Sequence, residues 1–311
     1  MAEGEETEVP EESQARPRSA PRDTAADAAT DAGAEDAGLH AALAARGPYG
    51  TTVGSALITM VEPHPGHEHA YNRWYEDDHF IAGAMAMPHM FAGRRWVATR
   101  ELQLLRYPEK SAIAQPITAG CYLSTYWLTP GRYPDHIRWS VEINKRLNRD
   151  GRVYQDRTHV FTAFQEHVAT AYRDGAAGPR DFHALDHPYQ GLVVEVIDTD
   201  TAEQSAAAYD WLMSRGLPRR LPRGGPAAMC VLFRPMPLPA GRMSYVKEVE
   251  GLDTRLTLLW FLDLPPQDCW SAAFTGLDEE TAGAVPGARV ELVAPFLPTV
   301  PGTDRYVDQL R

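Results

Sequence analysis

The chain has 311 residues, of which 44% are hydrophobic and 23% charged, and its formal net charge at pH 7 is -12. This length suffices for two ordinary domains with buried cores, and the acidic balance excludes a nucleic-acid partner, since phosphate binding requires clustered Lys and Arg. No apolar run in the sequence is long enough to span a membrane, and the N-terminus lacks the basic and apolar regions of a secretory signal, so we expect a cytoplasmic protein.

The cysteines and the short motifs disfavour several further classes. Cys121, Cys230 and Cys269 are far apart in the sequence and form no CxxC or Cys/His pair, so we expect free buried thiols rather than disulfides or structural zinc. No Walker, Rossmann, GxSxG or HExxH pattern occurs, which disfavours nucleotide binding, serine hydrolysis and metalloprotease chemistry.

In chain order, the first segment is an acidic leader and the next is a globular half. Residues 1–48 are rich in Ala, Glu, Asp, Pro and Thr and contain almost no large apolar residues, so we expect them to be disordered. The pattern then predicts a strand at 52–61, a helix to about Met85, one or two strands within 92–107, a strand at 118–128, a helix at 134–148 and a strand at 157–169.

The second half shows the same order of elements after a polar linker at 173–187. Strands are predicted at 191–198, 227–235, 255–264 and 288–298, and helices at 201–215, which begins at a threonine cap, and at 265–276. Strand, helix, strand, strand, helix, strand is the ferredoxin-like βαββαβ order. The sequence thus predicts an α+β protein with two ferredoxin-like βαββαβ repeats, at 49–172 and 188–311, whose sheets pack on each other around a barrel-like core.

The helix after the first strand, HEHAYNRWYEDDHFIA, carries the strongest indication of a site. Residues three and four apart on an α-helix are neighbours, so we expect Tyr71 to meet Tyr75, Tyr75 to meet His79, and Trp74 to meet Asp78. An aromatic stripe that ends in an imidazole and a carboxylate suits the wall of a pocket.

This segment and its flanks resemble the EthD-like branch of the dimeric α/β-barrel superfamily. In that branch a first strand, here ALITM, leads to a helix with a W-Y-x-x-x-H type motif, which Trp74, Tyr75 and His79 match. A loop of the P-G-F kind then leads to the second strand. Here the loop is MPHMFAGRR, which has His89 and Met90 between the proline and the phenylalanine.

The resemblance covers residues 52–166 through these motifs and 190–300 through element order alone. Members of the superfamily normally dimerise through their sheets, so a tandem copy implies an intramolecular dimeric α/β barrel, an internal pseudo-dimer that is a monomer or a weak homo-oligomer. The second half has Tyr209 and Trp211 but no histidine in its first helix, which implies that the first half carries the site. The superfamily includes polyketide cyclases, lactone isomerases, cofactor-free monooxygenases and some haem proteins, so the fold alone selects no reaction.

His79 and Tyr75 are the predicted catalytic residues. An imidazole with an ordinary pKa of about 6.5 can take and return a proton at neutral pH; the alternative for His79 is a structural histidine bonded to carbonyls at the helix end. Tyr75, one turn earlier, is expected to donate a hydrogen bond to a developing enolate or phenolate oxygen, and its alternative is ordinary aromatic core.

Five further residues are predicted to bind substrate. Tyr71 is a second hydroxyl donor and Trp74 a flat apolar wall, with aromatic core as the alternative for both. The alternative for Asp78 is a solvated carboxylate or a bond to a neighbouring loop. At most one of Arg94 and Arg95 can face a cavity, because successive side chains of a strand point to opposite faces.

We expect neither a metal nor a cofactor. The turn before the aromatic helix has a metal-like composition, Glu62, His64, His67, Glu68 and His69, but its Pro-Gly centre indicates a polar turn without convergent ligands.

A haem is a minor alternative. Its candidate ligands are His89, which is followed by Met90, and His159 and His167, although no CxxCH motif is present.

The sequence therefore favours a cofactor-independent lyase, isomerase or cyclase. In this hypothesis His79 is the general acid/base on a hydrophobic, aromatic or polyketide-like carbonyl compound that binds between sheet and helices of the first half. The alternatives are a noncatalytic small-molecule-binding or stress protein, and a haem or metal-binding oxidoreductase of the same superfamily.

Overall fold

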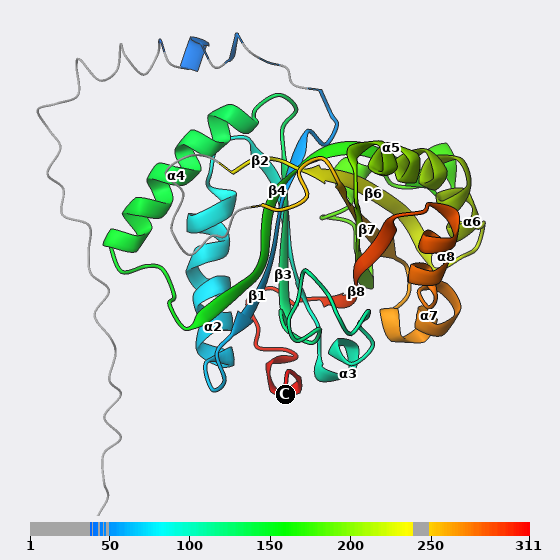
Figure 1. Cartoon of the computed structure of the whole chain (residues 1–311). Helices are drawn as coiled ribbons and strands as arrows, with labels where there is room; N and C mark the ends of the chain where they lie inside the picture. The colour runs from blue at the N-terminus through cyan, green and yellow to red at the C-terminus, as the bar shows by residue number, and fades with distance from the viewer. Residues whose placement is uncertain (1–37, 39, 43, 46, 48–49, 239–248) are drawn as a thin grey trace, which may run out of the picture. The chain divides into compact units, whose positions relative to one another are not determined.

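The computed structural model describes residues 50–238 and 249–311, together with residues 38, 40–42, 44, 45 and 47. Gly50–Arg311 is one compact unit (Figure 1). The leader predicted at 1–48 lies almost wholly outside the described residues, and the boundaries of two separate domains within the compact unit stay a prediction.

The first half follows the predicted order of strands and helices. Its first and third strands are almost wholly buried, because helices cover one face and the barrel interior the other, which explains near-continuous apolar runs such as SALITMV. The helix between the third and fourth strands has a proline in its first turn, as expected. The elements are β1 (Ser55–Pro63), α2 (Glu68–Trp74), the π-helical turns η1 (Tyr75–His79) and η2 (Ile81–Met85), β2 (Met90–Val97), α3 (Arg100–Gln103), β3 (Tyr122–Leu128), α4 (Tyr133–Arg149) and β4 (Arg157–Tyr172).

The second half repeats this order after the short 3₁₀ turns η3 (Gly175–Ala177) and η4 (Asp181–His183). Thr201 caps its first helix in a capping box with Gln204, which confirms the predicted helix start. The elements are β5 (Gly191–Thr199), α5 (Ala202–Trp211), the π-helical turn η5 (Leu212–Gly216), α6 (Leu217–Arg220), β6 (Ala227–Pro235), β7 (Arg255–Leu262), α7 (Pro266–Ala273), α8 (Leu277–Ala284), β8 (Ala288–Pro298) and η6 (Val307–Gln309).

The eight described strands form one closed antiparallel barrel. Each half contributes four strands in the ferredoxin-like order, β4-β1-β3-β2 and β8-β5-β7-β6. The halves join edge to edge: β4 pairs with β6 from Gln165↔Pro235 to Tyr172↔Met229, whereas β2 and β8 share only Trp96↔Pro298 and Val97↔Leu297. The two halves are therefore joined by one long and one short seam, and the predicted fold class is confirmed.

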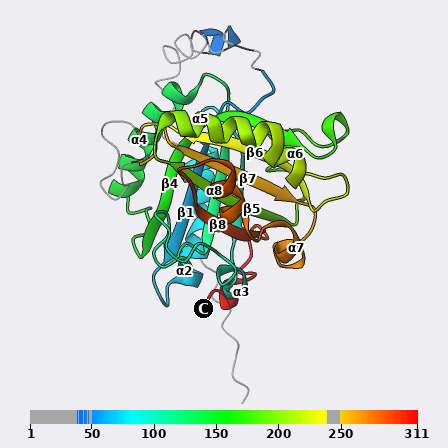
Figure 2. The same cartoon turned by 45° about the vertical axis from the view of Figure 1, so that its right-hand side comes forward.

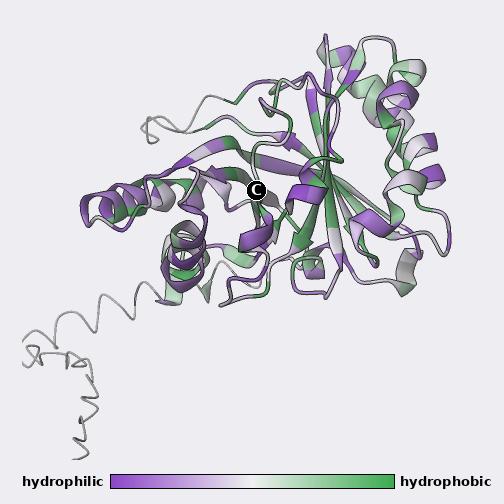
Figure 3. Cartoon of the chain, turned by 90° about the horizontal axis from the view of Figure 1, so that it is seen from below, coloured by the Kyte–Doolittle hydropathy of each residue, from purple (hydrophilic) through white to green (hydrophobic). Residues whose placement is uncertain are grey.

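The main core lies inside the barrel and takes side chains from both halves. Trp96 and Trp127 of the first half pack with Phe233, Phe261 and Phe296 of the second, and all five are fully buried. Hydrophobic residues accordingly concentrate along the strands in Figure 3. In Figure 1, α2 and α4 cover one side of the strands and α5 to α8 the other, and Figure 2 turns the second set of helices forward. The first half therefore packs its own two helices, α2 and α4, on the outer face of its sheet.

Two local features differ from the prediction. The segment after β2 was expected to hold a possible further strand, but it forms the short helix α3. Leu102 and Gln103 are buried next to each other, and Leu104 at the end of the helix is exposed. In a strand, Leu102 and Leu104 would point to the same face. Helix α8 was not predicted, because its sequence LDEETAGA has only a weak apolar stripe.

Candidate active site

The aromatic helix departs from α-helical geometry where it carries the predicted site. After α2 the backbone continues through η1, where the Phe80 N–H donates to the carbonyl five residues earlier, that of Tyr75. π-helical turns of this kind occur frequently at functional sites. A π-helical turn holds one more residue than an α-helical turn, so it rotates the side chains that follow it relative to those that precede it.

The ring contacts reflect this change of period. Tyr71 and Tyr75 are neighbours, with ring centroids 5.8 Å apart, and the rings of Tyr75 and His79 meet edge to face at 5.0 Å, as predicted. Trp74, however, stacks on His79, five residues later, at 4.3 Å and 21°. The predicted contact of Trp74 with Asp78 assumed the α-helical spacing of four residues, whereas the π-helical turn brings the residue five positions later next to Trp74. Two aromatic rings thus fix the imidazole plane.

Gly83 makes the room in which the imidazole of His79 lies. A Cβ atom at this position would lie 2.2 Å from Nδ1 of His79 and 2.4 Å from its Cε1. Nδ1 is buried and has no hydrogen-bond partner among the described residues. The alternative of a helix-end histidine bonded to backbone carbonyls does not apply to this nitrogen.

An apolar cavity of about 140 Å³ lies between the sheet of the first half and its two helices. Four of the predicted site residues line it, namely His79, Tyr75, Tyr71 and Trp74. Helix α4 closes the opposite side with Ile137, Ser140, Val141 and Asn144. The remaining lining residues are Leu57, Thr59, Val61, Gly83, Ala84, Met87, Met90, Tyr126, Val153, Arg157, His159, Thr162, Phe164 and Leu238.

A hydrogen-bonded row of polar side chains forms one wall of this cavity. Arg157 donates from Nε to Nε2 of His159 at 3.3 Å, and Nδ1 of His159 lies 2.8 Å from Oγ1 of Thr162. That hydroxyl is in turn 2.8 Å from Oγ1 of Thr59 on the neighbouring strand. Sequence reasoning missed Arg157, Thr162 and Thr59 and considered His159 only as a haem ligand.

Both histidines of the cavity are neutral at neutral pH. Burial, followed by the positive charge of Arg157, lowers the pKa of His79 to about 3. The same two causes lower the pKa of His159 to about 4. The sequence argument assumed an ordinary imidazole for His79; the pocket holds a weaker base that disfavours its protonated form.

These shifts make stability depend on pH. An unfolded histidine titrates at about 6.5, whereas His79 and His159 bind protons in the folded state only near pH 3 and 4. Between these values the unfolded state binds more protons, so the free energy of unfolding falls as the pH drops below 6.5. We expect each group to lower stability by up to about 2 kcal/mol at pH 5 relative to pH 7.

Urea unfolding of the wild type, His79→Gln and His159→Gln at pH 7 and pH 5 measures this effect. Each variant is expected to lose less stability between the two pH values than the wild type does. Equal losses in all three proteins would contradict the neutral state of the two imidazoles.

The two tyrosine hydroxyls of the site bond to each other. The hydroxyl oxygens of Tyr75 and Tyr126 are 2.6 Å apart in a buried position. Burial, followed by the neighbouring Tyr75, raises the pKa of Tyr126 well above its usual value, so this hydroxyl stays protonated. Two hydroxyls share one mutual hydrogen bond, so one O–H hydrogen of the pair is left for another acceptor. Tyr71 packs against Tyr122 at 5.3 Å on the inner side of the helix.

The other three predicted site residues do not line the cavity. Asp78 forms an ion pair with Arg152 of the loop after α4, so its bond to a neighbouring loop is the alternative observed. Arg94 packs over the ring of Trp96 at 4.7 Å and donates to carbonyls of the linker. Arg95 points to the opposite face of β2, where it pairs with Glu76 of η1.

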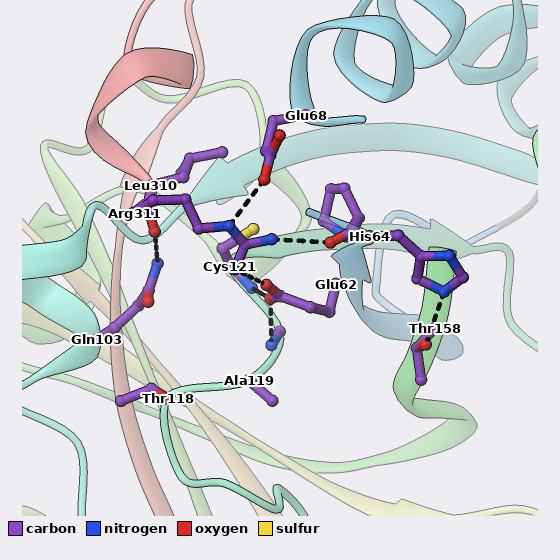
Figure 4. A network of polar contacts seen from close by, with 12 residues as sticks. Glu62, His64, Glu68, Gln103, Thr118, Ala119, Cys121, Thr158, Leu310 and Arg311 are labelled. Carbon is purple, nitrogen blue, oxygen red and sulfur yellow. Dashed lines mark hydrogen bonds and ion pairs between the residues drawn. The ribbon is translucent and has the colours of Figure 1, made fainter. Parts of the chain in front are cut away.

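The metal-like turn is a structural network (Figure 4). Glu62 accepts the backbone N–H groups of Gly120 at 2.8 Å and Cys121 at 2.9 Å. Arg311 donates to Glu68 at 2.7 Å and also pairs with Glu62. The three histidines bond separately to Thr158, Tyr154 and Asp308. Within the described ranges no group of three or more His, Cys, Asp or Glu side chains could hold a metal ion.

The cavity does not fit a haem. Its volume of about 140 Å³ is close to that of an engineered cavity of about 150 Å³ that binds benzene, whereas a porphyrin is several rings wide. Both ring nitrogens of His159 are engaged, and His167 bonds to Thr170 at 2.9 Å and lies 3.5 Å from Asp181. His89 occupies a turn with a φ of 69° outside the lining.

The fold and the site thus define an α/β barrel of two ferredoxin-like halves with a lined cavity between the sheet and the helices of the first half. Neither a family model nor a curated protein sequence matches the chain. Solved structures with an overall resemblance include an anthrone oxidase-like protein, at 11% identity and a TM-score of 0.45, covering 80% of this chain and 92% of that chain. A second is a dye-decolorizing peroxidase from Bacteroides thetaiotaomicron, at 10% identity and a TM-score of 0.46, covering 85% of this chain and 97% of that chain. A third is a heme-binding protein from Thermus thermophilus, at 10% identity and a TM-score of 0.44, covering 84% of this chain and 98% of that chain.

These matches are distant, and the assignment of the fold rests on the strand order of this chain. In the described part of the chain no helix is both long and apolar enough to cross a lipid bilayer.

Proposed function

We propose that the cavity is the active site of a cofactor-independent enzyme, a lyase, isomerase or cyclase of the EthD-like kind, that moves a proton on an aromatic or polyketide-like carbonyl compound. The observation that carries the proposal is His79 itself. It is a neutral imidazole that lines a mostly apolar cavity, where its ring stacks on Trp74 and lies next to Gly83. A neutral imidazole in such a place can accept a proton from a carbon acid.

The Tyr75–Tyr126 pair supplies the complementary group. Removal of a proton next to a carbonyl places negative charge on the oxygen, and a hydroxyl positioned at that oxygen stabilises the charge. The O–H hydrogen that the mutual bond leaves over is available for this purpose. The charge that develops on the oxygen also favours the protonated form of His79, which compensates for the low pKa of the free imidazole.

The second half supports a single site. Its space between sheet and helices is filled by a second apolar cluster and by the fully buried Glu195, which binds Arg220 and the indole N–H of Trp260. This packing agrees with the proposal that the second half is a structural partner in an internal pseudo-dimer that arose by tandem repetition. A cytoplasmic location stays a prediction.

A noncatalytic small-molecule-binding protein is the second candidate. The low pKa of His79 favours it, because a base with a pKa of about 3 is weak at neutral pH. A pH profile between 5 and 8 cannot separate the two candidates, since His79 does not titrate in that range.

Exchange of carbon-bound hydrogen in D₂O separates them. We expect the protein to accelerate loss of the α-proton signals of a one-ring enolisable ketone such as phenylpyruvate or benzoylacetone, followed by proton NMR. Native mass spectrometry of the freshly purified chain identifies any co-purified ligand for the same assay. Binding of these compounds without faster exchange would establish the noncatalytic alternative.

A further inference from the structure

A second cavity, of about 310 Å³, lies beside the short seam between β2 and β8. In the described part of the chain it shares no lining residue with the cavity at His79, so an inference about it does not depend on the proposed function. Its lining residues are Glu76 and Phe80 from the aromatic helix, Gly93, Arg94 and Arg95 of β2, Leu185 and Asp186 of the linker, and Thr299 and Pro301 after β8.

Arg95 brings unused hydrogen-bond donors to this cavity. Its side chain is 2% exposed, and its Nη1 donates to Oδ1 of Asn72 at 3.0 Å and to Glu76. The rings of Tyr75 and Tyr122 pack against the guanidinium at 4.2 and 5.0 Å. Nε and Nη2 are buried and have no hydrogen-bond partner among the described residues. Because a buried donor without an acceptor is costly and a ring face is only a weak acceptor, we expect a partner from outside the chain.

The two nitrogens without a partner lie on the same side of the guanidinium. Their N–H groups are parallel, and this arrangement matches the two oxygens of a carboxylate. Glu76 is already engaged, since Oε1 bonds to Nη1 of Arg95 and Oε2 accepts the backbone N–H of Gly302 at 2.7 Å. A single water molecule would satisfy one of the two donors well, whereas a carboxylate satisfies both.

We propose that this cavity is a second binding site, which takes an aromatic carboxylate whose two oxygens accept the Nε–H and Nη2–H of Arg95. The charge of Arg95 itself is balanced by Glu76, and the site depends on the two free donors rather than on an unpaired charge. Arg94 lies next to it in the lining and donates to neutral carbonyls, those of Leu185 at 3.4 Å and of His187. This second cation offsets part of the negative charge that the ligand brings.

The volume of the cavity and its apolar residues set the body of the ligand. An engineered cavity of about 150 Å³ binds benzene, so about 310 Å³ has room for two fused rings, whereas about 140 Å³ at His79 has room for one. Phe80, Leu185 and Pro301 supply apolar surface for the rings. A two-ring carboxylate therefore distinguishes the second cavity from the first.

Calorimetric titration with 2-naphthoate and 2-naphthamide tests the proposal. The two compounds have nearly the same shape and differ in charge. We expect 2-naphthoate to bind about 10- to 100-fold more tightly at pH 7, the range for a hydrogen bond to a charged group. In protein with ¹⁵N-labelled arginine, the Nε–H signal of Arg95, assigned by its loss in Arg95→Lys, should move when 2-naphthoate is added and stay in place with 2-naphthamide.

Arg95→Lys is the decisive variant, because it keeps a positive charge beside Glu76 and removes the two parallel donors. It should lose most of the preference for 2-naphthoate. The double variant Arg95→Met with Glu76→Gln removes both charges of the pair, so it gives the same comparison without stranding a buried charge. Arg289→Met is the control, since this arginine lies outside the lining in an exposed pair with Asp200, and it should keep the full preference. Circular dichroism checks that each variant folds.

Several results would overturn the second site. They are equal or tighter binding of 2-naphthamide, an unchanged preference in Arg95→Lys and the double variant, an Arg95 signal that does not move, and no binding of either compound. Selective binding of 2-naphthoate by a protein that does not accelerate hydrogen exchange would overturn the proposed function alone. Accelerated exchange without binding of 2-naphthoate would overturn the second site alone.

Discussion

The His79→Gln protein is expected to lose its hydrogen-exchange activity by about 10²- to 10⁴-fold, the usual contribution of a general base. Glutamine fills a similar volume but does not accept a proton at neutral pH. Because Nδ1 of His79 is without a partner among the described residues, the substitution removes no hydrogen bond at that atom. We therefore expect a change in unfolding free energy at pH 7 of less than about 1 kcal/mol. Rates at saturating ligand and urea unfolding curves measure the two effects.

Gly83→Ala is the matched variant, because it leaves the imidazole in the chain and removes its space. The added Cβ would lie 2.2 Å from Nδ1, so the ring must leave its present position, in which it stacks on Trp74. We expect a similar loss of rate, although alanine stabilises a helix by about 1 kcal/mol relative to glycine. Unchanged turnover in His79→Gln would refute the mechanism. Unchanged turnover in Gly83→Ala alone would show that the base tolerates displacement.

The aromatic stripe illustrates how much of the site the sequence predicts. Helical spacing correctly brought Tyr71, Tyr75 and His79 together, because neighbours on a helix follow from sequence separation alone. The stacking of Trp74 on His79 depends on a π-helical turn, and local propensity does not encode such a turn. Its stability comes from packing that exists only in the folded protein.

The polar row was missed for a related reason. Period-two alternation puts Arg157 and His159 on one face of β4, but Thr162 joins them only because the pairing of β1 with β4 shifts at Met60 and Val61. Alternation did predict that Arg94 and Arg95 face opposite sides. Neither arginine lines the cavity beside His79, because Arg95 pairs with Glu76 and Arg94 donates to carbonyls of the linker. These partners lie on other elements, so the sequence of β2 alone does not indicate them.

The fold was easier to predict from the sequence than the site. The order of elements predicts two ferredoxin-like halves, since antiparallel pairing and short connections leave few arrangements. The joining of the halves by β4 with β6 and β2 with β8 had no sequence signal, because the edge strands of both sheets carry ordinary apolar patterns.

Glu195→Ala is expected to destabilise the protein by about 2 to 4 kcal/mol, because it removes the hydrogen bonds that a fully buried carboxylate accepts and leaves a cavity in the core. Glu195 is fully buried and accepts from Nη1 of Arg220 at 3.2 Å and from Nε1 of Trp260 at 2.9 Å. Its removal leaves the buried indole N–H of Trp260 without its acceptor and takes one of two carboxylates from Arg220, which is 7% exposed and still pairs with Glu280. The difference in unfolding free energy between the variant and the wild type in urea measures the loss.

Two further variants decide what the ion pair does. Glu279→Ala, on the exposed side of α8, should change stability by less than about 1 kcal/mol. The double variant Glu195→Leu with Arg220→Met should recover most of the stability, because apolar residues of similar volume replace a buried ion pair at little cost. If the second half is only a scaffold, this double variant also keeps the exchange rate of the first-half cavity. A stable double variant without activity would instead mean that the buried pair contributes to the chemistry across the barrel.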